Sequence, residues 1–415
     1  MVLKMRKMKD SGIEWIGEIP EGWELTKVKR IFDIGRGRVI SQQELTSVGY
    51  PVYSSQTKNN GCLGYISTYD FDKSQLTWTT DGVNAGTVFL REGKHNCTNV
   101  CGTLAPKNDT NDLRYLKYAL EYIAFYHKRA DINGFKIMNN EIAEIELLLP
   151  PLFEQQNIAN YLDFKCSQTQ SILEQSLFSI EEYKKLKQAV ITQAVTKGVR
   201  GEREMKDSGV EWIGEIPKEW VCEKIKYATS ISRGLFNHRP RNDERYYNGK
   251  YPFIQTGDVA NATKYIVSYS QTLNELGKSV SKDFPKGTLT MTIAANVGDV
   301  AILNFDAYFP DSVVGFVPNK NIRTLYLFYV FSAMKDEFIR TAIKSTQLNL
   351  NIDRVKETFI PVTLNVNEQC EIENYLESKC AEIDGLIAKK EQLVKELESY
   401  KKSLIYEVVT GKREV

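Results

Sequence analysis

The chain has 415 residues, 42% of them apolar, which is enough hydrophobic material for packed cores in two or three domains. Its 54 Lys and Arg residues nearly balance 53 Asp and Glu residues, which excludes a polycation that holds nucleic acid by charge alone but leaves a local basic groove open. Seven cysteines are too sparse for a disulfide framework, and no apolar run of about 18 residues predicts a membrane span, so we expect a protein of a reducing compartment.

An internal repeat organises the chain. Residues 8–23 (MKDSGIEWIGEIPEGW) and 205–220 (MKDSGVEWIGEIPKEW) are identical at thirteen of sixteen positions. Residues 154–166 (EQQNIANYLDFKC) match residues 368–380 (EQCEIENYLESKC) at eight of thirteen positions. A period of about 200 residues is too long for a solenoid and indicates a duplicated domain. Because the starts and ends match while the middles diverge, we expect one frame with two different recognition tasks.

The two middle segments, residues 24–146 and 221–357, predict mixed α/β domains. In each, short β-rich runs are separated by Gly and Asn, and an amphipathic helix follows. The β-rich runs are residues 50–66, 75–90, 251–266 and 287–303, and the helices lie near 111–130 and 321–343.

Each middle segment leads into a long helix. Residues 154–197 contain no Pro or Gly, and in 368–410 only Gly385 interrupts. The heptad positions 383, 386, 390, 393, 397, 400 and 404 favour a coiled coil, and the aligned positions 169, 172, 176, 179, 183, 186 and 190 form a weaker seam. We expect the two helices, about 60 Å long each at 1.5 Å per residue, to pair antiparallel in a pseudo-twofold arrangement. The alternative is that each helix packs only on its own domain.

The fold class predicted from these elements is α+β. It is a tandem duplication of a mixed α/β domain plus a long helix, and the two helices pair as an antiparallel coiled coil.

Catalytic motifs are not found in the sequence. It has no phosphate-binding P-loop, no dinucleotide fingerprint and no Asn- or Asp-Pro-Pro-aromatic tetrapeptide of an amino-methylating enzyme. Three scattered histidines and a single close cysteine pair, Cys97 and Cys101, do not predict a metal site. We therefore predict no catalytic and no metal-binding residue.

Polar residues in the Gly-punctuated loops are candidates for DNA contacts. Arg pairs with guanine, Asn or Gln with adenine, and Lys with phosphates. Each residue alone is more often an ordinary turn or surface residue, but RGLFNHRPR at 233–241 concentrates Arg and His donors beside an aromatic ring. The candidates are Arg36, Arg38, Gln56, Lys58, Asn59, Asn60, Thr80, Asn84, Lys136, Arg233, Asn237, His238, Arg239, Arg241, Thr292, Asn296, Thr346, Gln347 and Asn349.

The order of these motifs resembles a known family. PPLFEQQNIANYL at 150–162, VTKG at 195–198, VTGK at 409–412 and the KDSGxEWIGEIPxxW starts are similar to the specificity (S) subunit of type I restriction–modification systems. The resemblance covers nearly the whole chain. In the second repeat, Ile360-Pro361-Val362 replaces the PP pair.

The resemblance implies a function without catalysis by this chain. Each middle segment would be a target recognition domain that reads one half of a bipartite, asymmetric double-stranded DNA site. The helices would dock two modification (methyltransferase) subunits, and restriction (translocase and nuclease) subunits would join them. It also implies that no cofactor binds this chain, since S-adenosylmethionine, ATP and Mg are expected on the partners, and that the complex works in a bacterial or archaeal cytoplasm without a membrane.

The resulting domain division is residues 1–152 and 201–361 for the first and second target recognition domains, 153–200 for the central helix and 362–415 for the C-terminal helix. Two other functions stay open: a self-contained DNA methyltransferase or restriction enzyme, and a coiled-coil assembly protein without a nucleic-acid role.

Overall fold

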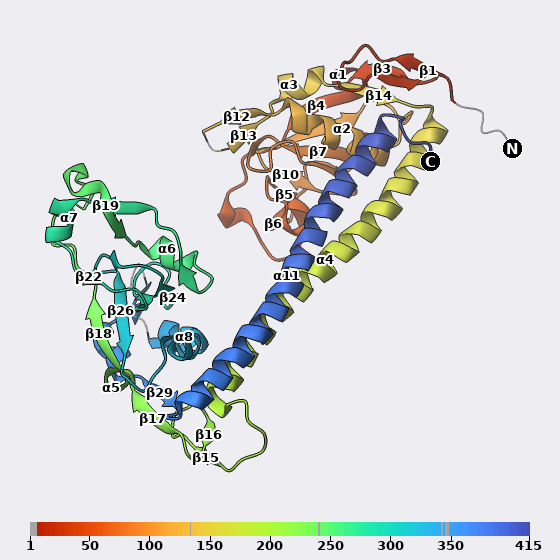
Figure 1. Cartoon of the computed structure of the whole chain (residues 1–415). Coiled ribbons are helices and arrows are strands. Elements are labelled where there is room, and N and C mark those ends of the chain that lie inside the picture. Colours follow the sequence, from red (N-terminus) through yellow and green to blue (C-terminus); the bar gives the residue numbers. More distant parts are fainter. Residues whose placement is uncertain (1–5, 133, 240, 342, 345–347) are drawn as a thin grey trace. The chain divides into compact units, whose positions relative to one another are not determined.

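A computed structural model describes residues 6–132, 134–239, 241–341, 343–344 and 348–415 (Figure 1). The chain forms two compact units: unit 1 comprises residues 1–177 and 391–415, and unit 2 comprises residues 178–390. Every helix within the described ranges is too short or too polar to span a membrane.

The mixed α/β domain of unit 1 is built on a four-stranded antiparallel sheet with the order β4-β11-β7-β9. Its strands are β4 (Phe32–Arg36), β7 (Gln75–Thr79), β9 (Val88–Arg91) and β11 (Cys101–Pro106). The smaller sheets are β1 (Met8–Asp10) with β2 (Glu18–Pro20), β3 (Glu24–Lys27) with β14 (Glu146–Leu149), β10 (Asn96–Cys97) with β5 (Tyr50–Tyr53) and β6 (Cys62–Ile66), and β12 (Arg129–Asp131) with β13 (Gly134–Lys136) and β8 (Asp81–Gly82). The helices are α1 (Val28–Ile31), η1 (Gln42–Glu44), η2 (Lys58–Gly61), α2 (Leu113–His127) and α3 (Asn139–Glu144).

Helix α2 packs against this sheet. The Asp112 carboxylate caps its N-terminus by accepting from the amides of Arg114 (2.8 Å) and Tyr115 (3.2 Å). Leu116 and Leu120, four residues apart on one face, share a core with Trp78 of β7. The amphipathic pattern expected near 111–130 is therefore confirmed.

The mixed α/β domain of unit 2 repeats this plan. Its main sheet has the order β18-β26-β23-β24-β20, with β18 (Thr229–Arg233), β20 (Tyr265–Ile266), β23 (Leu289–Thr292), β24 (Val300–Leu303) and β26 (Val313–Pro318). The other strands are β15 (Met205–Asp207), β16 (Glu215–Pro217), β17 (Val221–Lys224), β19 (Tyr247–Phe253), β21 (Gln271–Leu273), β22 (Asp283–Phe284), β25 (Ala307–Tyr308), β27 (Ile343–Lys344), β28 (Leu348–Asn349) and β29 (Phe359–Val362). The helices are α5 (Ile225–Ala228), η3 (Glu244–Tyr246), α6 (Thr256–Ala260), α7 (Glu275–Ser279), α8 (Thr324–Ala333), α9 (Lys335–Thr341) and α10 (Ile352–Glu357).

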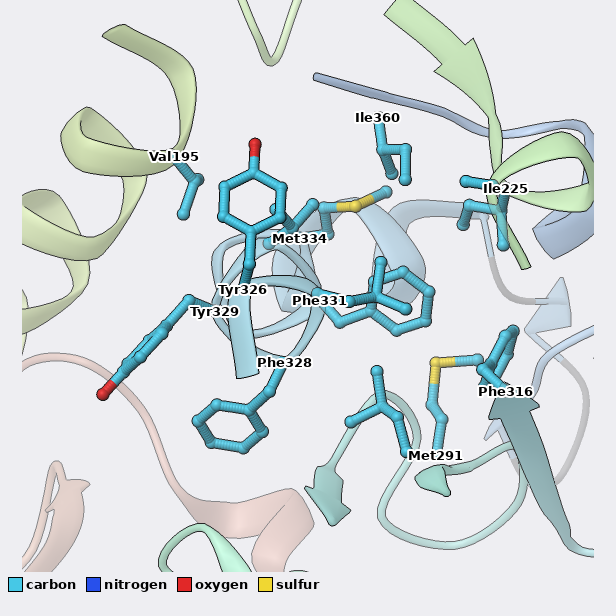
Figure 2. Close-up of a cluster of buried hydrophobic side chains, with 14 of the residues drawn as sticks. Val195, Ile225, Met291, Phe316, Tyr326, Phe328, Tyr329, Phe331, Met334 and Ile360 are labelled. Carbon is cyan, nitrogen blue, oxygen red and sulfur yellow. The ribbon is translucent and has the colours of Figure 1, made fainter. Parts of the chain in front are cut away.

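Helix α8 lies in the core of this domain (Figure 2). Tyr326, Phe331 and the following Met334 are fully buried, and Figure 2 shows around them Met291 and Phe316 from the main sheet and Val195 from α4 (Leu152–Lys197). A helix that is apolar on every side is stable only when it is covered on every side. The single helix expected near 321–343 ends at Ala333, and α9 begins two residues later.

The strand order confirms the duplication. β4, β11, β7 and β9 in unit 1 and β18, β26, β23 and β24 in unit 2 pair in the same order and the same antiparallel sense. The fold class is α+β, as predicted.

The long helices are α4 (Leu152–Lys197) and α11 (Val366–Val409). In unit 1 the first part of α4 shares a core with the last part of α11, for example Leu162 with Leu404. In unit 2 the last part of α4 meets the first part of α11, and Lys187 Nζ lies 2.7 Å from Asp384 Oδ2. The pairing is therefore antiparallel within each unit, as expected.

The seam of α4 differs from the predicted one. Leu173 and Ile180 are buried, whereas Ile172 and Leu186 are exposed. The buried positions are 166, 169, 173, 176 and 180, which keeps the heptad spacing but moves alternate positions by one residue. Because Thr169 and Ser176 lie in the seam, apolar residues alone did not reveal its register.

One glutamate on each long helix fixes the shared start segment of each repeat. In unit 1, Glu154 accepts hydrogen bonds from Arg6 (2.5 and 2.7 Å) and from the Trp23 indole (3.0 Å). In unit 2, Glu368 accepts from Arg203 (2.5 Å) and from the Trp220 indole (3.1 Å). Within each repeat, the shared start motif therefore contacts the shared motif at the beginning of the long helix.

Each start segment also packs on the last turns of a long helix. In unit 1, Trp23 shares a core with Val408 and Val409 of α11. Gly411 follows α11, and a Cβ atom there would lie 2.5 Å from Pro20. The core of unit 1 thus includes the last turn of α11.

Candidate nucleic-acid interface

The first group of predicted residues gathers at the end of β4. Arg36 is exposed, and its Nη2 donates to Thr80 Oγ1 at 3.0 Å. Lys136 in β13 lies opposite Asp81 in the strand register, and its Nζ is 3.1 Å from Asp131. The structure therefore brings Arg36, Thr80 and Lys136 to one edge of the domain.

Arg36 has a counterpart in the second repeat. Arg36 is the last residue of β4 and lies opposite Gly102 of β11. Arg233 is the last residue of β18 and lies opposite Val314 of β26. Arg233 is exposed, and its Nε donates to the Asp311 carbonyl at 2.6 Å. The two arginines are the best-matched pair among the predicted residues.

Two of the predicted residues, Thr80 and Thr292, form hydrogen bonds to backbone carbonyls inside the fold. Thr80 and Thr292 are fully buried. The Thr80 hydroxyl donates to the Val100 carbonyl at 3.1 Å, and that of Thr292 donates to the Asn296 carbonyl. We therefore assign both side chains to shaping loops, and this corrects the prediction that they face a ligand.

The loops after β7 and β23 are equivalent. Thr79 Oγ1 donates to the Asn84 carbonyl as Thr292 Oγ1 donates to that of Asn296. The amide of Gly86 bonds the Thr79 carbonyl, and the amide of Gly298 bonds the Thr292 carbonyl, both at 2.9 Å. Asn84 is half-buried and Asn296 is exposed. Before these asparagines, residues 80–83 read TDGV and residues 293–295 read IAA, so the two equivalent loops can present different side chains.

A second loop in unit 1 carries Gln56, Lys58, Asn59 and Asn60. The last three are exposed, whereas Gln56 is half-buried and donates to the Cys62 carbonyl. Asn59 and Asn60 adopt the left-handed region, with φ of 51° and 52°. Arg38 is exposed but ion-paired with Asp70 at 3.0 Å.

The RGLFNHRPR segment of unit 2 is organised by two aspartates. Asp311 pairs with Arg241 and with Arg239 at 3.7 Å. His238 Nε2 lies 3.0 Å from Asp243, and its ring stacks on Tyr246 with centroids 4.0 Å apart. The pKa of the Asp243 carboxyl is held well below its ordinary value, chiefly by its hydrogen bond to Arg245. These contacts order the arginines before any ligand is bound.

The remaining candidates are placed less fully. Asn237 is exposed in the same segment, and Asn349 ends β28. Thr346 and Gln347 lie outside the described residues.

Arg91 was missed by the sequence analysis. It is 1% exposed, and its Nη1 donates to the carbonyl of Asn60, at 2.7 Å, in the loop just described. The available signal was a charged residue in the otherwise apolar run VFLR.

Within the described part of the chain, no group of three or more His, Cys, Asp or Glu residues could hold a metal ion. Cys97 and Cys101 are buried free thiols, and burial raises the pKa of Cys101 to about 11.

The comparisons with known proteins agree with one another. The family described as the type I restriction modification DNA specificity domain matches residues 20–182 and 231–396. A protein named as a type I specificity subunit of Mycoplasma pneumoniae is 28% identical over 343 residues, which cover 81% of this chain and 84% of that protein. One named as the specificity subunit of the type I restriction enzyme MjaX of Methanocaldococcus jannaschii is 25% identical over 427 residues and covers 96% and 95%.

A solved structure is similar in fold. It comes from work on the complex assembly and conformational transition of the type I R-M system, and it superimposes with a TM-score of 0.73 at 13% identity, covering 95% of this chain and 99% of that one. The duplicated family match extends over most of the chain. The family comprises the non-catalytic subunits that give such systems their DNA specificity. This chain belongs to the family of type I restriction–modification specificity subunits.

Proposed function

We propose that this chain reads a bipartite, asymmetric DNA site, with one half-site for each recognition domain. The observation that carries the proposal is that two copies of one fold place equivalent arginines, Arg36 and Arg233, at matching strand ends but carry different residues in the equivalent loops after β7 and β23. Equivalent frames offer equivalent approaches to a duplex, and different side chains select different bases.

The charge distribution supports unequal roles for the two domains. Residues 221–357 carry 18 Lys and Arg against 13 Asp and Glu, whereas residues 24–146 carry 15 against 14. Phosphate contacts supply much of protein–DNA affinity and depend on net positive charge. The second domain would therefore hold its half-site more by charge, and the first more by shape and hydrogen bonds.

The matched pair Arg36 and Arg233 tests this function. The chain would be co-expressed with its modification subunit, and methylated adenines would be mapped across a genome to define both half-sites. A bidentate arginine–base contact contributes about 1–3 kcal/mol of discrimination, roughly 5- to 150-fold. Arg36→Ala should relax the first half-site alone, and Arg233→Ala the second alone. Loss of discrimination at both half-sites in both variants, or at neither, would contradict the proposal.

The long helices would dock two modification subunits, to which restriction subunits are added. Both units expose large apolar side chains on α4. Among them are two pairs eight residues apart, Phe164 and Ile172 in unit 1 and Phe178 and Leu186 in unit 2, while Leu152, Phe153 and Leu177 of unit 1 are also exposed. A separation of eight residues places each pair on one helical face. One such face in each unit fits one partner per unit.

We propose that the partner subunits bind the cofactors, S-adenosylmethionine and ATP with Mg. The complex would work in a bacterial or archaeal cytoplasm. The rival functions are separated by two simple measurements. Incubation of the pure chain with DNA and labelled S-adenosylmethionine should give no methyl transfer, whereas a self-contained methyltransferase would give it. A coiled-coil assembly protein would show no DNA retention that falls with rising salt.

A further inference from the structure

Arg91 is a buried cation at the end of β9. Its Nε donates to Thr77 Oγ1 at 3.1 Å and its Nη1 to the Asn60 carbonyl at 2.7 Å. The guanidinium carbon lies 3.6 Å from the ring centroid of Tyr53 and 4.3 Å from that of Phe89. Four groups from three strands and one loop therefore surround it.

This burial is unfavourable by itself. Among the described residues Arg91 forms no ion pair, and its Nη2 is buried without a hydrogen-bond partner. Burial lowers the pKa of the guanidinium, and the nearby phenol of Tyr53 opposes that shift only in part. Removing a charge from water without a counter-charge costs free energy that aromatic faces and two hydrogen bonds offset in part.

The strand itself does not require an arginine at this position. In the register of the second repeat, Leu303 of β24 corresponds to Arg91 of β9. Leu303 is 1% exposed in an apolar cluster. The same sheet is therefore built with leucine at this position, and the reason for Arg91 must lie in what its guanidinium contacts.

What the guanidinium contacts is the loop from Ser54 to Gly61. Asn59 and Asn60 in this loop have positive φ, a backbone conformation that non-glycine residues adopt uncommonly and that surrounding structure must hold. Gly61 has φ of +79°, and a Cβ atom there would lie 2.8 Å from Arg91 Nη2. The Ser54 amide donates to the Gly61 carbonyl at 2.9 Å and closes the loop.

We infer that Arg91 is a positioning residue for base readout by the first recognition domain. Its guanidinium holds the Asn60 carbonyl and thereby fixes the strained loop that presents Lys58, Asn59 and Asn60 outward. The inference rests on the proposed function, because the loop is taken to face DNA. It assigns specificity to a side chain that itself never reaches the duplex.

The test uses the full chain in complex with its modification subunit. Arg91→Leu installs the residue of the second repeat, and Arg91→Lys keeps the charge but loses the planar guanidinium. Methylation rates would be measured on the cognate site and on sites with single base changes in either half-site. We expect Arg91→Leu to lower discrimination in the first half-site by at least fivefold and to leave the second half-site unchanged, with Arg91→Lys between Arg91→Leu and wild type.

A second measurement keeps the test decisive. Amide hydrogen exchange of the same variants should be faster in residues 54–62 and unchanged in the core strands β7 and β11. Unchanged exchange in the loop, equal losses at both half-sites, or unchanged discrimination at the first half-site would overturn the inference. Should Arg91→Leu not fold, Arg91→Lys gives the same two readouts.

Failure of the inference differs from failure of the proposed function. A Lys58→Ala, Asn59→Ala double variant removes loop side chains without touching Arg91. If this variant relaxes the first half-site while Arg91→Leu does not, only the positioning role is wrong. If neither variant nor Arg36→Ala changes the first half-site, the assignment of that half-site to this domain is wrong.

Discussion

Glu154 and Glu368 occupy the same place in the two repeats but differ in burial. The Glu368 side chain is 1% exposed and that of Arg203 is 14% exposed, against 21% for Glu154 and 31% for Arg6. Glu368 also accepts from the Thr363 hydroxyl at 2.9 Å. Removing this carboxylate leaves the buried Trp220 indole and Thr363 hydroxyl without this acceptor, whereas Arg203 keeps Glu219 at 2.9 Å.

The two glutamates give a matched prediction. Removing one partner of a buried ion pair costs about 3–5 kcal/mol, and a partly exposed pair costs less because water screens it. Glu368→Ala should therefore destabilise unit 2 by that amount, and Glu154→Ala should destabilise unit 1 by less. Protection of core amides from hydrogen exchange in each unit would measure both. Equal losses in the two units would show that burial does not set the difference.

His95 gives a pH-dependent prediction. It is fully buried, with Nδ1 2.8 Å from the Gly93 carbonyl and Nε2 2.9 Å from Gln75 Nε2. Nδ1 therefore donates and Nε2 accepts, which describes a neutral ring. Burial lowers its pKa, and the charge of Arg91 lowers it further. The unfolded chain then binds a proton first, so stability falls as the pH drops below about 6.5 toward the lowered folded pKa.

Replacing this ring should flatten the acid branch of the stability curve. His95→Gln lowers overall stability but should reduce the loss of unit 1 stability between about pH 7 and 5. His127→Gln, at an exposed helix end, is the control and should keep the wild-type slope. Urea midpoints at the two pH values measure the slopes. The same slope in wild type and His95→Gln would mean that another group carries the acid sensitivity.

At the scale of elements, the repeat and its two long helices could be predicted. The sequence itself shows the identical segments of the two repeats and the near absence of Pro and Gly in the helical segments. The α4 seam could not be predicted, since Thr169 and Ser176 lie in the contact and only three-dimensional packing shows that Leu173 replaces Ile172. Arg36 and Arg233 were selected by side-chain type and loop position, and their contact with DNA stays a prediction. Thr80 and Arg91 were misjudged or missed because burial reverses what a polar side chain does.

The exposed faces of α4 predict how partners attach. Phe164 is 59% exposed and Phe178 is 67% exposed. Phe164→Ser and Phe178→Ser each remove one exposed aromatic ring from one unit, so each should weaken docking of one modification subunit. Native mass spectrometry of the co-expressed complex should then show a species with one modification subunit, and the double variant a free chain. Gln168→Ser, also exposed on α4, is the control and should assemble as wild type. Full assembly of the double variant would exclude these faces.

At the scale of the whole molecule, α4 and α11 both contain a division between the units. We propose that the paired helices set the distance between half-sites. Four residues inserted after position 177 and four after position 390 add about 6 Å and about one turn, so the helical faces are nearly kept. The spacer of the methylated site should lengthen by just under two base pairs at about 3.4 Å each. An unchanged spacer would contradict this role, and insertion into α4 alone should disturb the pairing.

The contact of Trp23 with the end of α11 has a consequence for synthesis on the ribosome. Unit 2 is continuous in sequence, whereas unit 1 needs residues 391–415 to complete its core. At about 5–20 residues per second, the nascent first domain waits roughly 10–40 s for its missing turns. The domain made first is therefore finished last. Until then its open face is a place where a chaperone can bind, and a chain truncated near its end should be degraded from its N-terminal unit.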